Sequence, residues 1–182
     1  MRRIFLVSLT LALVSPNLTA AQSGWPVYTP PDKSFKVELP EPAKFRRKKV
    51  KPKDDLFEGK TKVGDTYILK LRQGNPESFF SISVFHLFSP VNNRQFDERV
   101  YLLALIVGGD KEESDFTKRA DVIVDGFHGR EFIFQKGNVN GRLLFINAGR
   151  RIYALQYYSE VEGEIDSKNA ARIFDTFRLM WR

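Results

Sequence analysis

The sequence predicts an α+β protein with an antiparallel sheet of about seven strands and two main helices, near 93–107 and 167–179. Apolar and polar residues alternate through most of the chain, and an alternation of period two is typical of half-buried strands. Two segments instead place apolar residues three and four positions apart, as amphipathic helices do. These two segments do not alternate with single strands, so the pattern indicates an antiparallel sheet rather than a parallel sheet of βαβ units.

The chain begins with the order of features that is typical of a secretory signal peptide. Arg2 and Arg3 precede an apolar run of eleven residues, which a proline and a group of small residues follow. As a helix this run would extend only about 16 Å, roughly half of the hydrocarbon thickness of a membrane. We therefore expect residues 1–21 to be cleaved after Ala21 or Ala20, with an uncleaved anchor as the alternative.

Export to the periplasm or the medium follows from such a signal peptide. The Sec route is favoured over the twin-arginine route, although Arg2 and Arg3 also fit the twin-arginine pattern.

The rest of the chain is expected to form one domain. Residues 22–33 hold three prolines and read as an extended N-terminal arm pinned by Trp25 and Tyr28, and residues 34–182 read as a single α+β domain. A chain of about 160 residues buries roughly two-thirds of its unfolded surface, which suffices for one core. There is no cysteine, which excludes disulfides, thiolate metal ligands, a lipid-anchored cysteine and a cysteine nucleophile.

The first half of the domain is expected to contain three strands and a helix. Phe35, Val37 and Leu39 alternate with polar residues in the first strand, and strands over 66–72 and 78–88 are joined by a turn-rich loop. The helix over 93–107 has apolar residues at spacings of four and three. Asn92, just before it, and Gln95, three residues on, resemble a capping pair.

The second half is expected to be a meander with a final helix. Four strands are predicted near 117–124, 130–136, 142–148 and 151–158, and their short connections can join only antiparallel neighbours. Gly126 and Gly129 flank the first connection, where we expect them to supply positive φ angles. Ala170, Ile173, Phe174 and Phe177 then fall on one face of the helix over 167–179.

A basic strip over 44–53 stands out from the rest of the chain. Its cations are Lys44, Arg46, Arg47, Lys48, Lys49, Lys51 and Lys53. The chain without its signal peptide has a net charge of about +5 and the strip alone has +7, so everything else carries about −2. Such a dense run of like charges should be exposed and extended.

Two interpretations of the strip remain open. It could dock a polyanion, namely an anionic lipid surface, an acidic envelope polymer or an acidic protein face; nucleic acid is disfavoured because the protein is exported. Alternatively, its lysines serve only to solubilise a strand edge and to block edge-to-edge pairing. Asp54, Asp55 and Glu58 follow closely and could neutralise part of its charge.

No catalytic residue, cofactor site or metal site is predicted. His86 and His128 are the only histidines, and a zinc site needs three or four converging ligands. We expect His86 to be a hydrogen-bonded histidine at the edge of the core and His128 to lie in a turn. Arg130 and Glu131 are expected to form a salt-bridged strand start or a recognition patch. No Gly-x-Ser-x-Gly elbow or phosphate-loop spacing is present.

Short segments spread over the domain resemble the PsbP-like superfamily, here as a bacterial exported protein. They are Trp25, Tyr28, the Phe-Lys-Val-Glu-Leu-Pro of 35–40, Asp125-Gly126, the Gly-Arg-Glu-Phe of 129–132, the Arg-Ile-Tyr-Ala-Leu of 151–155 and the Phe-Asp-Thr-Phe-Arg-Leu of 174–179. The resemblance implies an α-β-α sandwich-like fold, no enzyme activity and a role in assembly or partner binding. It carries over no set of binding residues.

The sequence thus favours a non-catalytic binding or assembly module of the bacterial cell envelope, which presents 44–53 to an acidic partner or an anionic surface. The alternative is a carrier of a small apolar ligand, with a pocket beside the sheet. A hydrolase is the third hypothesis. A structure can distinguish the binding module from the carrier, since only a carrier needs a cavity.

Overall fold

The computed structural model describes residues 24–40, 45–50, 64–71, 78–107 and 115–180. The described strands are β1 (Val27–Tyr28), β2 (Phe35–Glu38), β3 (Phe45–Val50), β4 (Gly64–Leu71), β5 (Ser78–His86), β6 (Asp115–Val124), β7 (Phe127–Lys136), β8 (Val139–Asn147), β9 (Arg151–Ser159) and β10 (Arg178–Leu179). The helices are α1 (Asn93–Val107), α2 (Lys168–Thr176) and a short 3-10 turn, Glu164–Asp166. The expected signal peptide over 1–21 and the strip residues Lys44, Lys51 and Lys53 lie outside these ranges.

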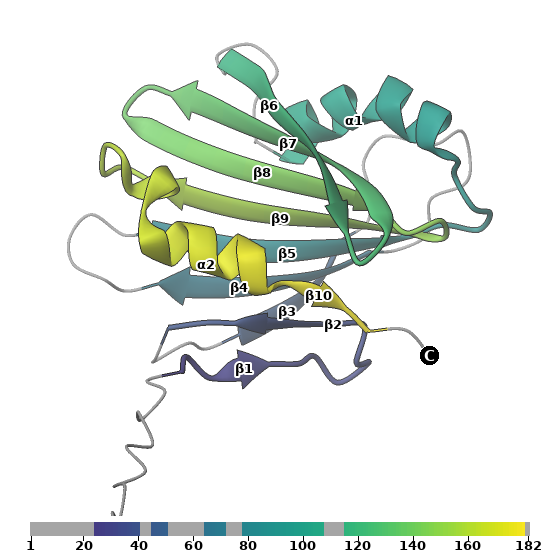
Figure 1. Ribbon diagram of the computed structural model, residues 1–182, viewed down its shortest axis with the longest axis horizontal. Helices are drawn as coiled ribbons and strands as arrows, with labels where there is room; N and C mark the ends of the chain where they lie inside the picture. Colours follow the sequence, from purple (N-terminus) through teal and green to yellow (C-terminus); the bar gives the residue numbers. More distant parts are fainter. Residues whose placement is uncertain (1–23, 41–44, 51–63, 72–77, 108–114, 181–182) are drawn as a thin grey trace, which may run out of the picture.

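The architecture is two antiparallel sheets with two helices, which confirms the α+β class (Figure 1). A seven-stranded sheet has the order β3-β4-β5-β9-β8-β7-β6, and a three-stranded sheet has the order β1-β2-β10. The neighbours β6, β7, β8 and β9 follow one another in sequence, as the predicted meander requires. None of the described helices is long and apolar enough to cross a membrane.

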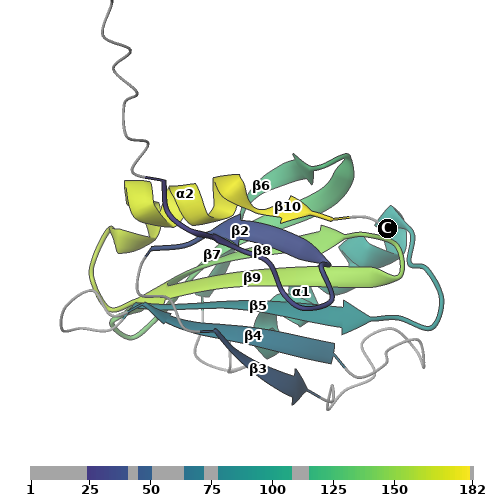
Figure 2. The ribbon, with the colours of Figure 1, turned by 90° about the horizontal axis from the view of Figure 1, so that it is seen from below.

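Each face of the seven-stranded sheet carries its own hydrophobic core. On one face Phe96 and Leu103 of α1 pack with Phe145 and Ala154, and we call this the α1 side. On the other face α2 and the three-stranded sheet cover the α2 side, where Phe35 packs with residues such as Tyr153 and Phe177 (Figures 1 and 2). Because side chains alternate along a strand, Tyr153 and Ala154 enter different cores.

The chain forms more sheet than the sequence predicts. The described residues contain ten strands instead of about seven, and the predicted strand at Phe35 belongs to the small sheet. The helix expected over 167–179 ends at Thr176, because Phe177 is extended (φ −63°, ψ 128°) and β10 then pairs with β2. Phe177 is fully buried in this extended backbone, so its apolar character did not require a helix.

The expectation for the glycines beside the β6–β7 turn is half right. Asp125 (φ 49°) and Gly126 (φ 84°) form the two central residues of the turn, and two positive φ angles are typical of a type I′ hairpin. Gly129 lies within β7 and has no positive φ, so its predicted role is wrong. Instead it permits a close approach, since a Cβ there would lie 2.7 Å from the carbonyl oxygen of Phe145.

Candidate functional site

The structure places the described part of the basic strip on β3, at one edge of the seven-stranded sheet. Arg46, Arg47, Lys48 and Lys49 are four successive cations, and all four are exposed. In the β3–β4 register Arg47 lies opposite Tyr67, which is buried in the core of the α2 side. Arg47 and Lys49 therefore lie on the α2 side, and Arg46 and Lys48 lie on the α1 side.

On the α2 side the strip is partly neutralised by Asp65 of β4. Nε and Nη2 of Arg47 donate to the two carboxylate oxygens of Asp65, each at 3.0 Å, and Lys49 is the register partner of Asp65. The hydrogen bond from Arg47 holds the pKa of Asp65 below its usual value, against the opposing effect of burial. Arg47 is thus paired with this carboxylate, and the charge of Lys49 lowers its pKa further.

His86 continues this group on the next strand. Its Nε2 lies 3.7 Å from Oδ2 of Asp65, beyond the usual length of a direct hydrogen bond. Burial lowers the pKa of His86, and the neighbouring Arg151 on β9 lowers it further. The half-buried position at the end of β5 agrees with a histidine at the edge of the core.

On the α1 side the strip faces neutral neighbours. Arg46 lies opposite Ile68, and Lys48 lies opposite Thr66. Thr66 is hydrogen-bonded to Ser83 of β5, with 2.9 Å between the two hydroxyl oxygens. Among the described residues no ion pair includes Arg46 or Lys48, so their charge is uncompensated by that part of the chain.

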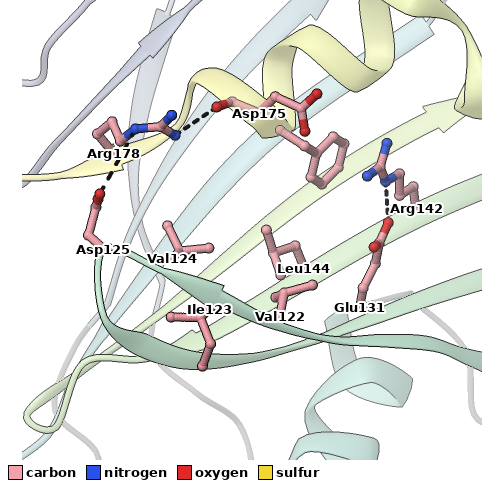
Figure 3. A pocket seen from close by; sticks show the side chains of 10 residues that line it. Val122, Ile123, Val124, Asp125, Glu131, Arg142, Leu144, Asp175 and Arg178 are labelled. Carbon is pink, nitrogen blue, oxygen red and sulfur yellow. Dashed lines mark hydrogen bonds and ion pairs between the residues drawn. The ribbon is translucent and has the colours of Figure 1, made fainter.

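A pocket of about 440 Å³ opens on the α2 side, at the opposite end of the strand order from β3 (Figure 3). It lies between β6–β8 and the segment that joins α2 to β10. Its lining combines apolar and charged side chains: Val122, Ile123, Val124, Asp125, Glu131, Arg142, Leu144, Phe174, Asp175 and Arg178. A pocket beside the sheet is the feature that the small-ligand hypothesis requires, but the walls of this pocket are not uniformly apolar.

One end of the pocket is formed by an ion pair between Glu131 of β7 and Arg142 of β8 (Figure 3). The Cζ atom of Arg142 also lies 4.3 Å from the ring centroid of Phe174 on α2, a cation–π contact. Nε of Arg119 lies 3.9 Å from Glu131, and its Nη1 donates to Asp166 at 2.6 Å. Acidic and basic side chains therefore alternate at this end of the pocket, in the order Asp166, Arg119, Glu131 and Arg142, and their charges balance.

An irregularity in β6 brings Arg119 to this end of the pocket. The register between β6 and β7 shifts between Lys118 and Ala120, which indicates a β-bulge. Bulges redirect a side chain and are frequent next to functional sites. The contribution of Arg119 could not be predicted from sequence, because no local residue pattern marks the extra residue.

The other end of the pocket holds the start of β10 in place. Asp125 accepts a hydrogen bond from the backbone N–H of Leu179 at 2.7 Å. Arg178 donates from Nη1 to the carbonyl oxygens of Asp175 and Phe177, both at 2.7 Å, and its Nε lies 3.9 Å from Asp125. The same turn that reverses β6 into β7 therefore also fixes the chain beyond α2.

His128 and Arg130 lie on the α1 side, where they join β7 to α1. Nε2 of His128 lies 2.9 Å from Oδ1 of Asp97, and Nη2 of Arg130 lies 2.9 Å from Oδ2 of the same carboxylate. Arg130 also pairs with Asp121. His128 is in β7 and not in the turn, and the salt-bridged interpretation of Arg130 and Glu131 is the one that the contacts support. In the described part of the chain, no three histidine or acidic side chains converge as a metal site.

Comparisons with known proteins assign this chain to no family. No family model and no curated protein matches the chain. Among solved structures, a protein from Bacteroides thetaiotaomicron is similar with a TM-score of 0.46 and 12% sequence identity. The match covers 87% of this chain but only 49% of that protein, so the chain spans about half of its length.

Proposed function

We propose that the protein is a non-catalytic binding module that docks an acidic partner through the basic strip over 44–53. The observation that carries the proposal is the run from Arg46 to Lys49: four successive exposed cations on a strand of a packed sheet. Because the strand fixes their positions, these cations form a preorganised positive edge rather than a fluctuating tail. Such an edge attracts polyanions over a range of about one Debye length, roughly 10 Å at 0.1 M salt.

The cellular setting is part of the same proposal. Residues 1–21 as a cleaved signal peptide would place the module in the bacterial cell envelope or outside the cell. The fold is proposed to be of the PsbP-like, α-β-α sandwich type. This is supported by the position of α1 and α2 on opposite faces of the seven-stranded sheet.

The test is the affinity of the protein for acidic probes at several salt concentrations. Polyglutamate and vesicles with anionic or neutral lipids are suitable probes. Replacing Arg46, Arg47, Lys48 and Lys49 by Gln should weaken binding by about tenfold or more at low salt, since each cation near an anionic surface contributes on the order of 1 kcal/mol.

A matched control removes the same charge elsewhere. Lys36, Arg94, Arg150 and Lys168 are also exposed, and their replacement by Gln changes the net charge equally. The control variant should retain most of the affinity. Equal losses in the two variants, or binding that ignores ionic strength, would contradict a localised docking strip.

A second candidate function, the small-ligand carrier, is favoured by the pocket beside α2. Val122, Val124 and Leu144 give it an apolar floor, while ion pairs form its ends. The ligand would therefore be amphipathic rather than purely apolar. Alkyl carboxylates and alkylamines of equal chain length are suitable probes. Amide chemical-shift changes that cluster around Leu144 and Phe174 are expected, and changes scattered over the surface would argue against the pocket.

A further inference from the structure

We propose that the acidic partner is an extended peptide segment that adds to the outer edge of β3 as a further strand. Its acidic side chains occupy alternate positions, opposite Arg46 and Lys48. This inference rests on the proposed docking function of the strip and names the class of partner.

The backbone of β3 provides the first argument. β3 is six residues long, and in the described part of the chain it pairs with β4 alone. In a strand with one neighbour, alternate residues direct their N–H and C=O groups away from the sheet. These groups are the template for strand addition, in which main-chain hydrogen bonds provide affinity and alternate side chains provide specificity.

The distribution of charge over the two faces provides the second argument. On the α2 side Asp65 already accepts two hydrogen bonds from Arg47 and lies opposite Lys49. A further carboxylate on that side would compete with Asp65 for the same cations. Partner residues on the α2 side are therefore expected to be neutral.

The α1 side requires the opposite chemistry. Ile68 and Thr66 are the register partners of Arg46 and Lys48, and neither carries a charge. The Thr66 hydroxyl is hydrogen-bonded to the Ser83 hydroxyl, so Thr66 already has a partner within the sheet. A carboxylate on an added strand would lie directly opposite each cation on the same face, as in other stabilising cross-strand pairs.

The two interpretations of the strip, docking of an acidic partner and blocking of edge-to-edge pairing, are then compatible. Cations at an edge repel basic strands and make the docking of apolar strands unfavourable, which prevents indiscriminate edge-to-edge pairing. A strand with acidic residues two positions apart escapes this exclusion, because it offers opposite charge where the edge is uncompensated. The protection of the edge and the choice of partner have the same physical cause.

The test uses two peptides of identical composition and charge. One alternates Glu and Thr, and the other places all its Glu residues before its Thr residues. The alternating peptide should bind about threefold more tightly or better, because an extended backbone presents all of its carboxylates on one face. The variant R46Q/K48Q should lose more affinity for it than R47Q/K49Q, which removes the same charge from the other side of β3.

N-methylation of the peptide separates strand addition from simple attraction. Methylating every second amide removes hydrogen-bond donors without changing charge, and only alternate amides of an added strand point toward β3. One of the two methylation patterns should therefore abolish the preference for the alternating peptide, and the other should preserve it.

The outcomes distinguish the two proposals. Strand addition is wrong if the two peptides bind equally, the two methylation patterns have the same effect, and R46Q/K48Q loses no more affinity than R47Q/K49Q. The proposal of a docking strip stands in that case, provided that binding still depends on salt and on the four cations. The same conclusion follows if the protein binds anionic vesicles but binds neither peptide. If the loss of all four cations changes nothing for any probe, both proposals fail.

Discussion

At the scale of single residues, the ion pair between Glu131 and Arg142 places two opposite charges in a mostly buried position. The two side chains are 9% and 13% exposed. Neither charge could have been recognised from sequence as mostly buried, because the two partners come from different strands. Arg119 reaches Glu131 only through the bulge at Lys118 and Ala120.

Replacing Arg142 by Met should destabilise the protein by about 3 kcal/mol, because Glu131 would retain only the more distant Arg119 as a counter-charge. The double variant E131L/R142M should recover much of this loss, since a buried ion pair can often be exchanged for apolar side chains of similar volume. Urea unfolding at neutral pH measures both changes.

Arg94→Met is the control for this prediction. Arg94 pairs with Glu98 on the surface of α1 and is 88% exposed, so its loss should cost less than about 0.5 kcal/mol. If R142M behaved like R94M, or if the double variant were no more stable than R142M, the account of this pair as a costly buried charge would be wrong.

At the scale of elements, the sequence predicts what local interactions determine. The helix over 93–107 is confirmed as Asn93–Val107, and so is the capping pair of Asn92, just before it, and Gln95, in its first turn. The backbone N–H of Gln95 donates to the side chain of Asn92 at 2.9 Å. Spacing of apolar residues and a capping pair suffice for this element, because both act within a few residues.

Some features that depend on distant pairing were not predicted. β10 exists because Leu179 pairs with Phe35 and bonds to Asp125, and nothing within 174–179 distinguishes this arrangement from a longer helix. Asn147 is a similar case: its buried side chain donates to the carbonyl of Val91 at 3.0 Å and so joins β8 to the start of α1. The pocket is equally invisible in sequence, since five separate elements surround it.

The basic strip falls between these two cases. Its charge density predicted an exposed, extended segment, and the residues from Arg46 to Lys49 of β3 are both exposed and extended. Charge density alone could not assign Arg47 and Lys49 to one face and Arg46 and Lys48 to the other. That assignment needs the register with β4, which depends on Tyr67 being directed into the core.

At the scale of the whole molecule, the ends of the domain close the fold. β2 pairs with β1 on one side and with β10 on the other, so the small sheet joins the start of the described chain to its end. Phe35 of β2 is fully buried, with its ring centroid 5.3 Å from that of Tyr67 and 5.5 Å from that of Phe177. The seven-stranded sheet lies between this core and the one beneath α1.

This shared sheet predicts that damage to either core lowers the stability of both. Phe35 on the α2 side and Phe96 on the α1 side are both 0% exposed, and replacing either by Ala should cost about 3–5 kcal/mol. Neighbouring residues of one strand, such as Tyr153 and Ala154, enter opposite cores, so we expect the loss of one core to break the sheet that the other core needs. Each variant should therefore unfold in a single transition, with coincident curves from far-ultraviolet and aromatic circular dichroism.

Phe→Leu variants at both positions provide the same comparison at a smaller loss of stability. A two-step curve for the Phe96 variants alone would show that α1 detaches independently. The stability of the sheet would then depend on the core of the α2 side alone.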